Sequence, residues 1–239
     1  MNNLNKKNNS KIKMSNTDTV KVVLLGEPGV GKTCIINRYS YDQYNERTVS
    51  SISAQFITKT VDFKNINKSI RYEIWDTAGQ EKFHSLAKIF YKDAKVICLV
   101  YDITLKESFE KMKSYWYEQE VLLNADGQPI FVVVGNKFDL YEKRQVSDEE
   151  ALDFAKSIRA IFQYTSAKNA SGINELFNNI GNKYFNPDFN LLEQEKKERE
   201  LYEKKKENKT KNKNYNQERN SYKLDSSSKS ELEQKKGCC

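Results

Sequence analysis

The sequence has few cysteines and prolines and a single histidine: four, three and one in 239 residues. Cys34 and Cys98 lie in predicted apolar elements, and Cys238 and Cys239 are the last two residues. This arrangement provides neither a disulfide framework nor a zinc-binding spacing. The class of small secreted proteins that depend on disulfides is therefore excluded.

Long apolar runs are also lacking. No run approaches the length of a membrane span, and the Asn- and Lys-rich start has no apolar core like that of a signal peptide. We therefore expect a protein that is made and kept in the cytosol.

A strong charge is missing from the central part of the chain, although the formal net charge of the whole is +7. Residues 1–19 carry four basic side chains against one acid, and residues 187–239 carry 14 against 11. Residues 20–186 carry 22 basic side chains against 21 acids. Because this part is nearly neutral, a large nucleic-acid-binding face is not expected, and we predict no nucleic-acid partner.

The patterning predicts one folded domain between two polar ends. Residues 1–19 are too poor in apolar side chains to offset the entropy of ordering, so they are predicted to be a disordered extension. Residues 20–185 are long enough to bury one core. Residues 186–239 are charged and are predicted to be a flexible tail.

Within the predicted domain, apolar runs and helical patterns alternate. Residues 54–63 and 69–75 are expected to form an antiparallel hairpin, and residues 41–53 a loop that a ligand holds. The alternation predicts an α/β fold, a mostly parallel six-stranded sheet with helices on both faces and ligands at the carboxyl ends of the strands. The predicted strands are 20–25, 54–63, 69–75, 94–101, 129–135 and 161–164, and the predicted helices are 32–40, 106–124, 148–160 and 171–184.

The first strand leads into GEPGVGKT, residues 26–33, which fits the phosphate-binding pattern G-x-x-x-x-G-K-[ST]. Its glycines let successive backbone N–H groups point at an anion, and the following helix adds its positive end. Lys32 would place a charge on the outer phosphates, and the Thr33 hydroxyl would ligate Mg²⁺. The loop leaves open whether the base is adenine or guanine, and whether phosphate is transferred or hydrolysed.

Polar motifs follow later predicted strands. Asp76 ends a strand as a Mg²⁺-holding Walker-B acid does, and the Gly79 N–H could meet the γ-phosphate. Asp139 in NKFD, residues 136–139, could accept both hydrogens of the guanine N1 and N2 edge, where adenine presents an acceptor. NKFD alone could be a polar turn, but the phosphate loop together with Ser-Ala-Lys at residues 166–168 favours guanine.

These motifs resemble a known family. GEPGVGKT, WDTAGQE, NKFD and TSAK, in this order and spacing, resemble the Ras-like small GTPases over residues 20–185. The stretches AQFITKTV (54–61), IWDTAGQEKFHSLA (74–87), VYDIT (100–104) and AIFQYTSAKNASGINELF (160–177), with the terminal Cys-Cys, resemble the Rab family, and most of all its early-endosomal branch. The resemblance implies the G-domain fold of P-loop NTPases.

The resemblance also implies residue roles. Gln80 would be catalytic by orienting the attacking water, Tyr44 would cover the guanine ring, and Thr33, Ser51 and Asp76 would hold Mg²⁺. The Ala167 N–H would meet the guanine oxygen, and Lys137 would pack along the nucleotide. The implied nucleotide-binding residues are Gly29, Val30, Gly31, Lys32, Thr33, Cys34, Tyr44, Ser51, Gly79, Asn136, Lys137, Asp139, Ser166, Ala167 and Lys168.

Two further sites are implied at the surface. Phe56, Trp75 and Phe90 align with the aromatic patch through which Rab proteins meet effectors, and simple core packing is the alternative. Cys238 and Cys239 resemble the signal for two geranylgeranyl groups, and ordinary exposed thiols are the alternative.

The implied function is a switch in endosomal trafficking that binds GTP or GDP with Mg²⁺, hydrolyses GTP slowly and recruits effectors to membranes. The implied partners are an exchange factor, an activating protein, effectors and a lipid-masking carrier, at the cytoplasmic face of endosomal or other intracellular membranes. A P-loop kinase or ATPase is one alternative, and a GTP-loaded membrane scaffold with little hydrolysis is another.

Four positions depart from the family pattern. Pro28 replaces a small residue and could crowd the attacking water, and Ser51 replaces a threonine, which loses a methyl group that stiffens the rotamer. Ser53 and Phe90 replace a glycine and a tyrosine, so effector choice could differ. His84 is interpreted as a switch-region side chain, not a catalytic base.

Overall fold

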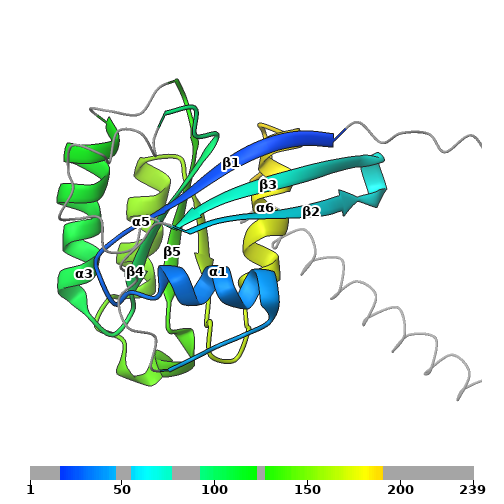
Figure 1. The fold of residues 1–239 in the computed structure, drawn as a ribbon. Coiled ribbons are helices and arrows are strands. Elements are labelled where there is room, and N and C mark those ends of the chain that lie inside the picture. The colour runs from blue at the N-terminus through cyan, green and yellow to red at the C-terminus, as the bar shows by residue number, and fades with distance from the viewer. Residues whose placement is uncertain (1–16, 47–54, 77–91, 123–126, 191–239) are drawn as a thin grey trace, which may run out of the picture. The chain divides into compact units, whose positions relative to one another are not determined.

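The computed structural model describes residues 17–46, 55–76, 92–122 and 127–190 (Figure 1). The chain divides into two units, residues 1–189 and 190–239. Asn190 is the one described residue of the second unit, so the fold given below is that of the first.

The centre of the fold is a six-stranded sheet in the order β2-β3-β1-β4-β5-β6. β2 is antiparallel to β3, and the other neighbours are parallel. The predicted mostly parallel sheet and its antiparallel hairpin are therefore confirmed. The strands are β1 (Thr17–Leu25), β2 (Gln55–Phe63), β3 (Lys68–Asp76), β4 (Val96–Asp102), β5 (Ile130–Asn136) and β6 (Ile161–Tyr164).

Helices cover both faces of the sheet (Figure 1). On one face α1 packs against α6, with the Tyr39 and Phe177 rings stacked at 3.6 Å between centroids. On the other face α3 packs against α5, where Phe109 meets Phe154 edge to face. The helices are α1 (Lys32–Tyr41), α3 (Lys106–Lys111), continued by a π-helical segment (Met112–Val121), α5 (Asp148–Ser157) and α6 (Ile173–Phe185), and short 3₁₀ turns span Lys64–Ile66 and Phe138–Lys143.

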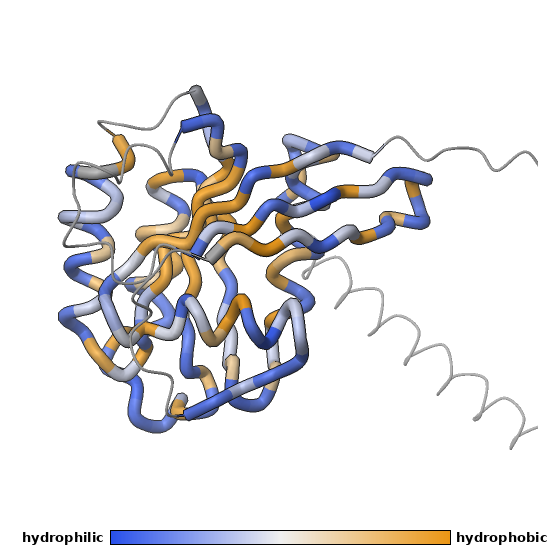
Figure 2. The backbone as a smooth tube through the Cα atoms, in the orientation of Figure 1, coloured by the Kyte–Doolittle hydropathy of each residue, from blue (hydrophilic) through white to orange (hydrophobic). Residues whose placement is uncertain are grey.

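The core consists of the strands that the apolar runs predicted. Every residue of β4 is buried, as expected for a parallel strand that is covered on both faces. Figure 2 shows the same pattern: hydrophobic residues run through the central strands, and hydrophilic residues lie on the outer turns of the helices.

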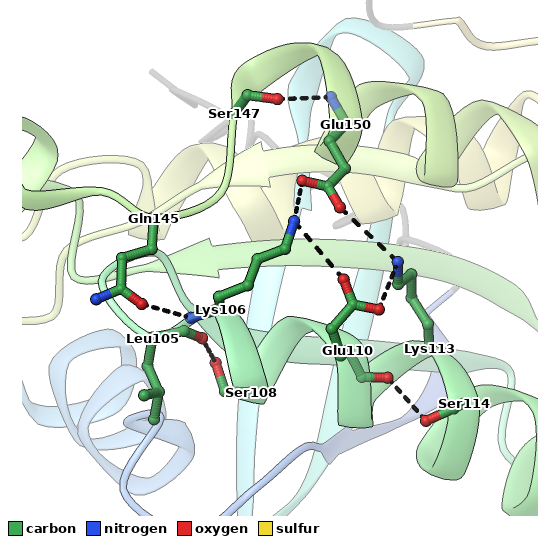
Figure 3. A network of polar contacts seen from close by, with 9 residues as sticks. All are labelled: Leu105, Lys106, Ser108, Glu110, Lys113, Ser114, Gln145, Ser147 and Glu150. Atoms are coloured by element: carbon green, nitrogen blue, oxygen red, sulfur yellow. Dashed lines mark hydrogen bonds and ion pairs between the residues drawn. The ribbon is translucent and has the colours of Figure 1, made fainter.

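Polar contacts join α3 to the start of α5 (Figure 3). Lys106 and Lys113 each lie between the carboxylates of Glu110 and Glu150. The Lys106 N–H also donates to the Gln145 side chain at 3.1 Å. Since these ion pairs are substantially exposed, we expect them to add little stability, although they connect α3 and its π-helical continuation to the start of α5.

Several predicted boundaries were wrong. β1 begins at Thr17 and not at residue 20, because residues 17–19 pair with Ser69–Arg71 of β3. α5 ends at Ser157, just before Arg159 takes a left-handed φ of 54°. α6 begins at Ile173, after Gly172 with φ of 71°. None of the helices in the described part of the chain has the length and apolar character that a membrane crossing needs.

The strand order places the polar motifs together. The strand order changes direction at β1, because β3 lies on one side of it and β4 on the other. Open α/β sheets bind their ligands at such a point. Residues 26–31 follow β1, and Asp76 ends β3. Residues 136–139 and 166–168 follow β5 and β6. Because these strands are parallel, all four motifs come to one edge of the sheet.

Candidate nucleotide-binding site

The loop between β1 and α1 makes a tight turn that requires glycine at two points. Gly26 has φ of 148°, and a Cβ there would lie 2.1 Å from the Val100 carbonyl oxygen. Gly31 has φ of 98°, and its Cβ would lie 2.3 Å from the Asn136 amide nitrogen. Gly31 also caps α1 without a side-chain hydrogen bond, so the first N–H groups of the helix face the loop. This geometry suits a phosphate group.

The loop is held at its second residue, Glu27. The Glu27 carboxylate accepts from the Trp116 indole N–H at 3.0 Å and lies 3.3 Å from the Lys111 ammonium. Lys32 is 5% exposed, and its ammonium donates to the carbonyl oxygens of Gly26 and Glu27 at 2.6 and 3.0 Å. Its positive charge therefore lies against the loop, where an anion would be held.

Thr33 and Asp76, two of the three residues predicted to ligate Mg²⁺, contact each other. The Thr33 hydroxyl donates to the Asp76 carboxylate at 2.6 Å, and both residues are buried. Hydroxyl and carboxylate oxygens suit Mg²⁺, which proteins bind through few side chains together with substrate phosphates and water. The donor set therefore fits the ion. Ser51, the third predicted ligand, lies outside the described residues.

Asn136 connects the phosphate loop to the end of β6. Its amide nitrogen donates to the Val30 carbonyl at 2.8 Å, and its oxygen accepts from the Thr165 hydroxyl at 3.1 Å. The Asn136 residue is 2% exposed. A buried amide that is satisfied on both sides fixes the two loops relative to each other.

Asp139 and Ser166 meet at the same edge of the sheet. The buried Ser166 hydroxyl donates to the Asp139 carboxylate at 2.6 Å, whereas Asp139 itself is exposed. Partial burial raises the pKa of the Tyr44 phenol, and the negative charge of Glu46 raises it further. Lys168 and Asp139 are also close enough to act on this phenol electrostatically. Tyr44 therefore lies near the motif residues predicted to bind the base.

Lys137 has a partner that the sequence motifs did not identify. Its ammonium lies 2.6 Å from the Asp102 carboxylate, which also accepts from the Thr104 N–H and hydroxyl. The sequence feature that could have identified Asp102 is its position as the last residue of β4. Polar residues at the ends of these parallel strands gather at one edge of the sheet. The structure thus adds Asp102 to the site as the residue that holds Lys137.

Of the predicted effector patch, Phe56 and Trp75 are described, and they lie side by side. They face each other across β2 and β3, with ring centroids 4.8 Å apart. Phe56 is 50% exposed, whereas Trp75 partly packs against the core. Core packing, the alternative to an effector patch, therefore does not explain why an aromatic side chain stands at position 56.

The remaining predicted residues divide into two sets. In the described part, Gly29 and Lys168 are exposed, Val30 and Ala167 are buried, and Cys34 is half-buried. The predicted residues that lie outside the described part are Ser51, Gly79, Gln80, Phe90, Cys238 and Cys239.

The region from Lys21, within β1, to Asn186, just after α6, matches one known family. The model of the Ras family matches residues 21–186. The chain belongs to the Ras family. This Ras-family chain is 44% identical to Ras-related protein Rab-22A of Homo sapiens over 174 residues, which cover 72% of this chain and 87% of the human protein. It is 43% identical to Ras-related protein Rab-21 of Bos taurus over 161 residues, 67% of this chain and 71% of the bovine protein.

These relatives confirm the predicted Rab family and its early-endosomal branch. The Rab protein is therefore a GTPase, which binds GTP and GDP and acts as a switch in endosomal trafficking. Its partners include an exchange factor, an activating protein and effectors, as membership of the family implies. A P-loop kinase, an ATPase or a scaffold without turnover is not favoured.

Proposed function

We propose that the guanine nucleotide of this Rab protein lies along the sheet edge, with its phosphates on residues 26–33 and its base between residues 136–139 and 166–168. The observation that carries the proposal is the Asn136 bridge. Because this side chain bonds both Val30 and Thr165, it ties the phosphate-binding loop to the turn after β6. A nucleotide needs both ends held at a fixed distance, and this bridge sets that distance.

In this arrangement Asp139 reads the base. Its carboxylate accepts the N1 and N2 hydrogens of guanine, with one oxygen already oriented by Ser166. Adenine presents an acceptor at that edge and would leave the carboxylate unpaired, at a cost of several kcal/mol. Tyr44 covers the ring, the Ala167 N–H meets the guanine oxygen, and Lys137 packs along the nucleotide, held by Asp102.

Thr33, Asp76 and Ser51 are proposed to hold Mg²⁺ beside the phosphates. Held by these side chains, Mg²⁺ would supply positive charge that offsets the negative charge developing on the phosphates during hydrolysis. Lys32 adds a second positive charge at the phosphates, and the Gly79 N–H contacts the γ-phosphate. Gln80 orients the attacking water.

Removal of Mg²⁺ tests the role of Thr33. We expect a chelator to speed GDP release from the wild type by about tenfold or more, since a divalent ion contributes several kcal/mol at a phosphate. Thr33→Ala should release GDP rapidly with or without the chelator, because the ligand is already lost. Release of fluorescently labelled GDP measures both rates.

Thr33→Ser is the matched control, because it keeps the hydroxyl that meets Asp76 and should respond to the chelator as the wild type does. If Thr33→Ala stayed as sensitive to the chelator as the wild type, Thr33 would not be a Mg²⁺ ligand.

The GTP form is proposed to recruit effectors through the half-exposed Phe56 and the partly buried Trp75 beside it. Their contact across β2 and β3 supports a surface role, since half of Phe56 remains open to a partner. Phe90 is the third proposed member of this patch.

Membrane attachment is proposed to depend on Cys238 and Cys239. The net charge of residues 187–239 is 14 − 11 = +3, which attracts anionic lipid by about 1 kcal/mol per basic residue near the surface. That is too weak for stable residence, whereas two lipid chains anchor stably. The doubly prenylated protein would cycle between the cytoplasmic face of endosomal membranes and a cytosolic carrier that hides the lipids.

Replacing both cysteines by serine should make the protein fully soluble in cells and leave nucleotide binding unchanged. Either single replacement should leave weak or misplaced membrane binding, because one chain anchors only marginally. Fractionation of cell membranes, with GDP binding as the control, measures both properties. A double variant that sediments with endosomal membranes like the wild type would contradict the proposal.

A further inference from the structure

Arg38, which the sequence motifs did not single out, reaches from α1 to the base-binding turn. Its Nε donates to the Ala167 carbonyl at 2.8 Å, and its Nη2 donates to the Lys168 carbonyl at 3.1 Å. The two acceptors belong to consecutive residues, which matches the fixed fork of a guanidinium group. A lysine ammonium lacks this planar fork.

The same guanidinium is held from its other side. Its Nη1 donates to the Asp42 carbonyl at 3.0 Å and to the Asp42 carboxylate at 2.9 Å. The Arg38 side chain is 16% exposed, whereas that of Asp42 is 87% exposed. Arg38 is therefore anchored at four acceptors at its own helix end and in the turn, and these bonds fix the orientation of its guanidinium.

The bonds of Arg38 lie next to the Ala167 N–H. The Ser166 N–H donates to the Ser171 carbonyl at 2.9 Å, which fixes the Thr165–Ser166 peptide, one peptide unit before the one that carries the Ala167 N–H. Arg38 fixes the peptide after it, through the Ala167 carbonyl. Within the described residues, the N–H between these two points has no hydrogen-bond partner, although Ala167 is 3% exposed. A buried donor held in this way is suited to a ligand acceptor.

We infer that Arg38 is a positioning residue that aims the Ala167 N–H at the oxygen on C6 of guanine. The inference rests on the proposed function, which places the guanine oxygen at this N–H. α1 then acts at both ends of the nucleotide, with Lys32 and Thr33 at the phosphates and Arg38 behind the base. Arg38 lies six positions after Lys32, a rise of roughly 9 Å along the helix.

The test compares two ligands that differ at one atom. 6-Thioguanosine diphosphate replaces the C6 oxygen of GDP by sulfur, which is a weak acceptor. Competition of each ligand against the same fluorescently labelled GDP gives the preference for GDP over the thio analogue. A loss of packing weakens both ligands alike and leaves this ratio unchanged, whereas a misaimed N–H lowers it.

We expect Arg38→Ala to weaken GDP binding and to reduce the preference for GDP by about fivefold, the value of one hydrogen bond. Arg38→Lys keeps the charge and the stem but loses the fork, so it should also lower the ratio. Asp42→Asn is the matched control, because it removes the ion pair and leaves both bonds to the turn. Its ratio should equal that of the wild type.

The outcomes separate this inference from the function on which it rests. If the Arg38 variants weaken both ligands by the same factor, Arg38 only braces the fold and the inference is wrong. If Arg38→Ala does not fold, the ratio for Arg38→Lys decides. If the wild type does not prefer GDP over the thio analogue, the proposed contact between Ala167 and guanine fails, and the role of Arg38 fails with it.

Discussion

Replacing Asp139 by asparagine should weaken GTP binding by about a hundredfold or more and shift the preference to xanthine nucleotides. The amide N–H₂ would face the N1 and N2 hydrogens of guanine, so two donors would meet and an acceptor would be lost. Xanthine carries an oxygen at C2, which can accept from that amide. Competition of GTP, XTP and ATP against labelled GDP measures the change.

Two comparisons make the Asp139 result specific. ATP should compete poorly with the wild type, because adenine leaves the carboxylate unpaired. Ser166→Ala removes the 2.6 Å hydrogen bond that orients Asp139, so it should weaken GTP binding without favouring XTP. Unchanged GTP affinity in the Asp139→Asn variant would show that this carboxylate does not read the base.

The sequence predicted the sheet well because its strands carry strong local signals. β4 is a continuous apolar run, and β2 and β3 alternate around a short polar turn, so each strand is evident without its partner. The start of β1 was missed because residues 17–19 are polar and become a strand by pairing with β3. Pairing between residues 52 positions apart leaves no local pattern, as for Thr17 and Ser69.

The motifs also located the candidate site, but not the contacts that shape it. Thr33 and Asp76 could be assigned to one site because each belongs to a motif of its own. Arg38 belongs to no such motif. Its partners in the turn after β6 lie 129 and 130 positions away and are backbone carbonyls, so any residue type could supply them. Contacts of this kind depend on how α1 packs beside the turn after β6, which a linear pattern does not encode.

Replacing Gln80 by leucine should leave GTP affinity intact and slow hydrolysis by about a hundredfold or more in the presence of an activating protein. Leucine has no group that can orient the attacking water, and the proposed phosphate contacts belong to other residues. Single-turnover hydrolysis of bound GTP, with and without the activating protein, measures the rate, and GTP release measures the affinity. Equal rates in the wild type and the variant would remove Gln80 from the proposed mechanism.

If the wild type hydrolyses GTP slowly, Pro28 is the first residue to test as the cause. Its ring is exposed in the phosphate loop, between Glu27, which Trp116 and Lys111 hold, and Gly29 with φ of 78°. Proline also fixes its own φ, so the ring has little freedom to move away from an incoming water. If Pro28 crowds that water, Pro28→Ala should raise the single-turnover rate of the wild type but not that of the Gln80→Leu variant. The same rate in Pro28→Ala and the wild type would exclude the proline as the cause of slow hydrolysis. Ser51→Thr would then be the next variant to test.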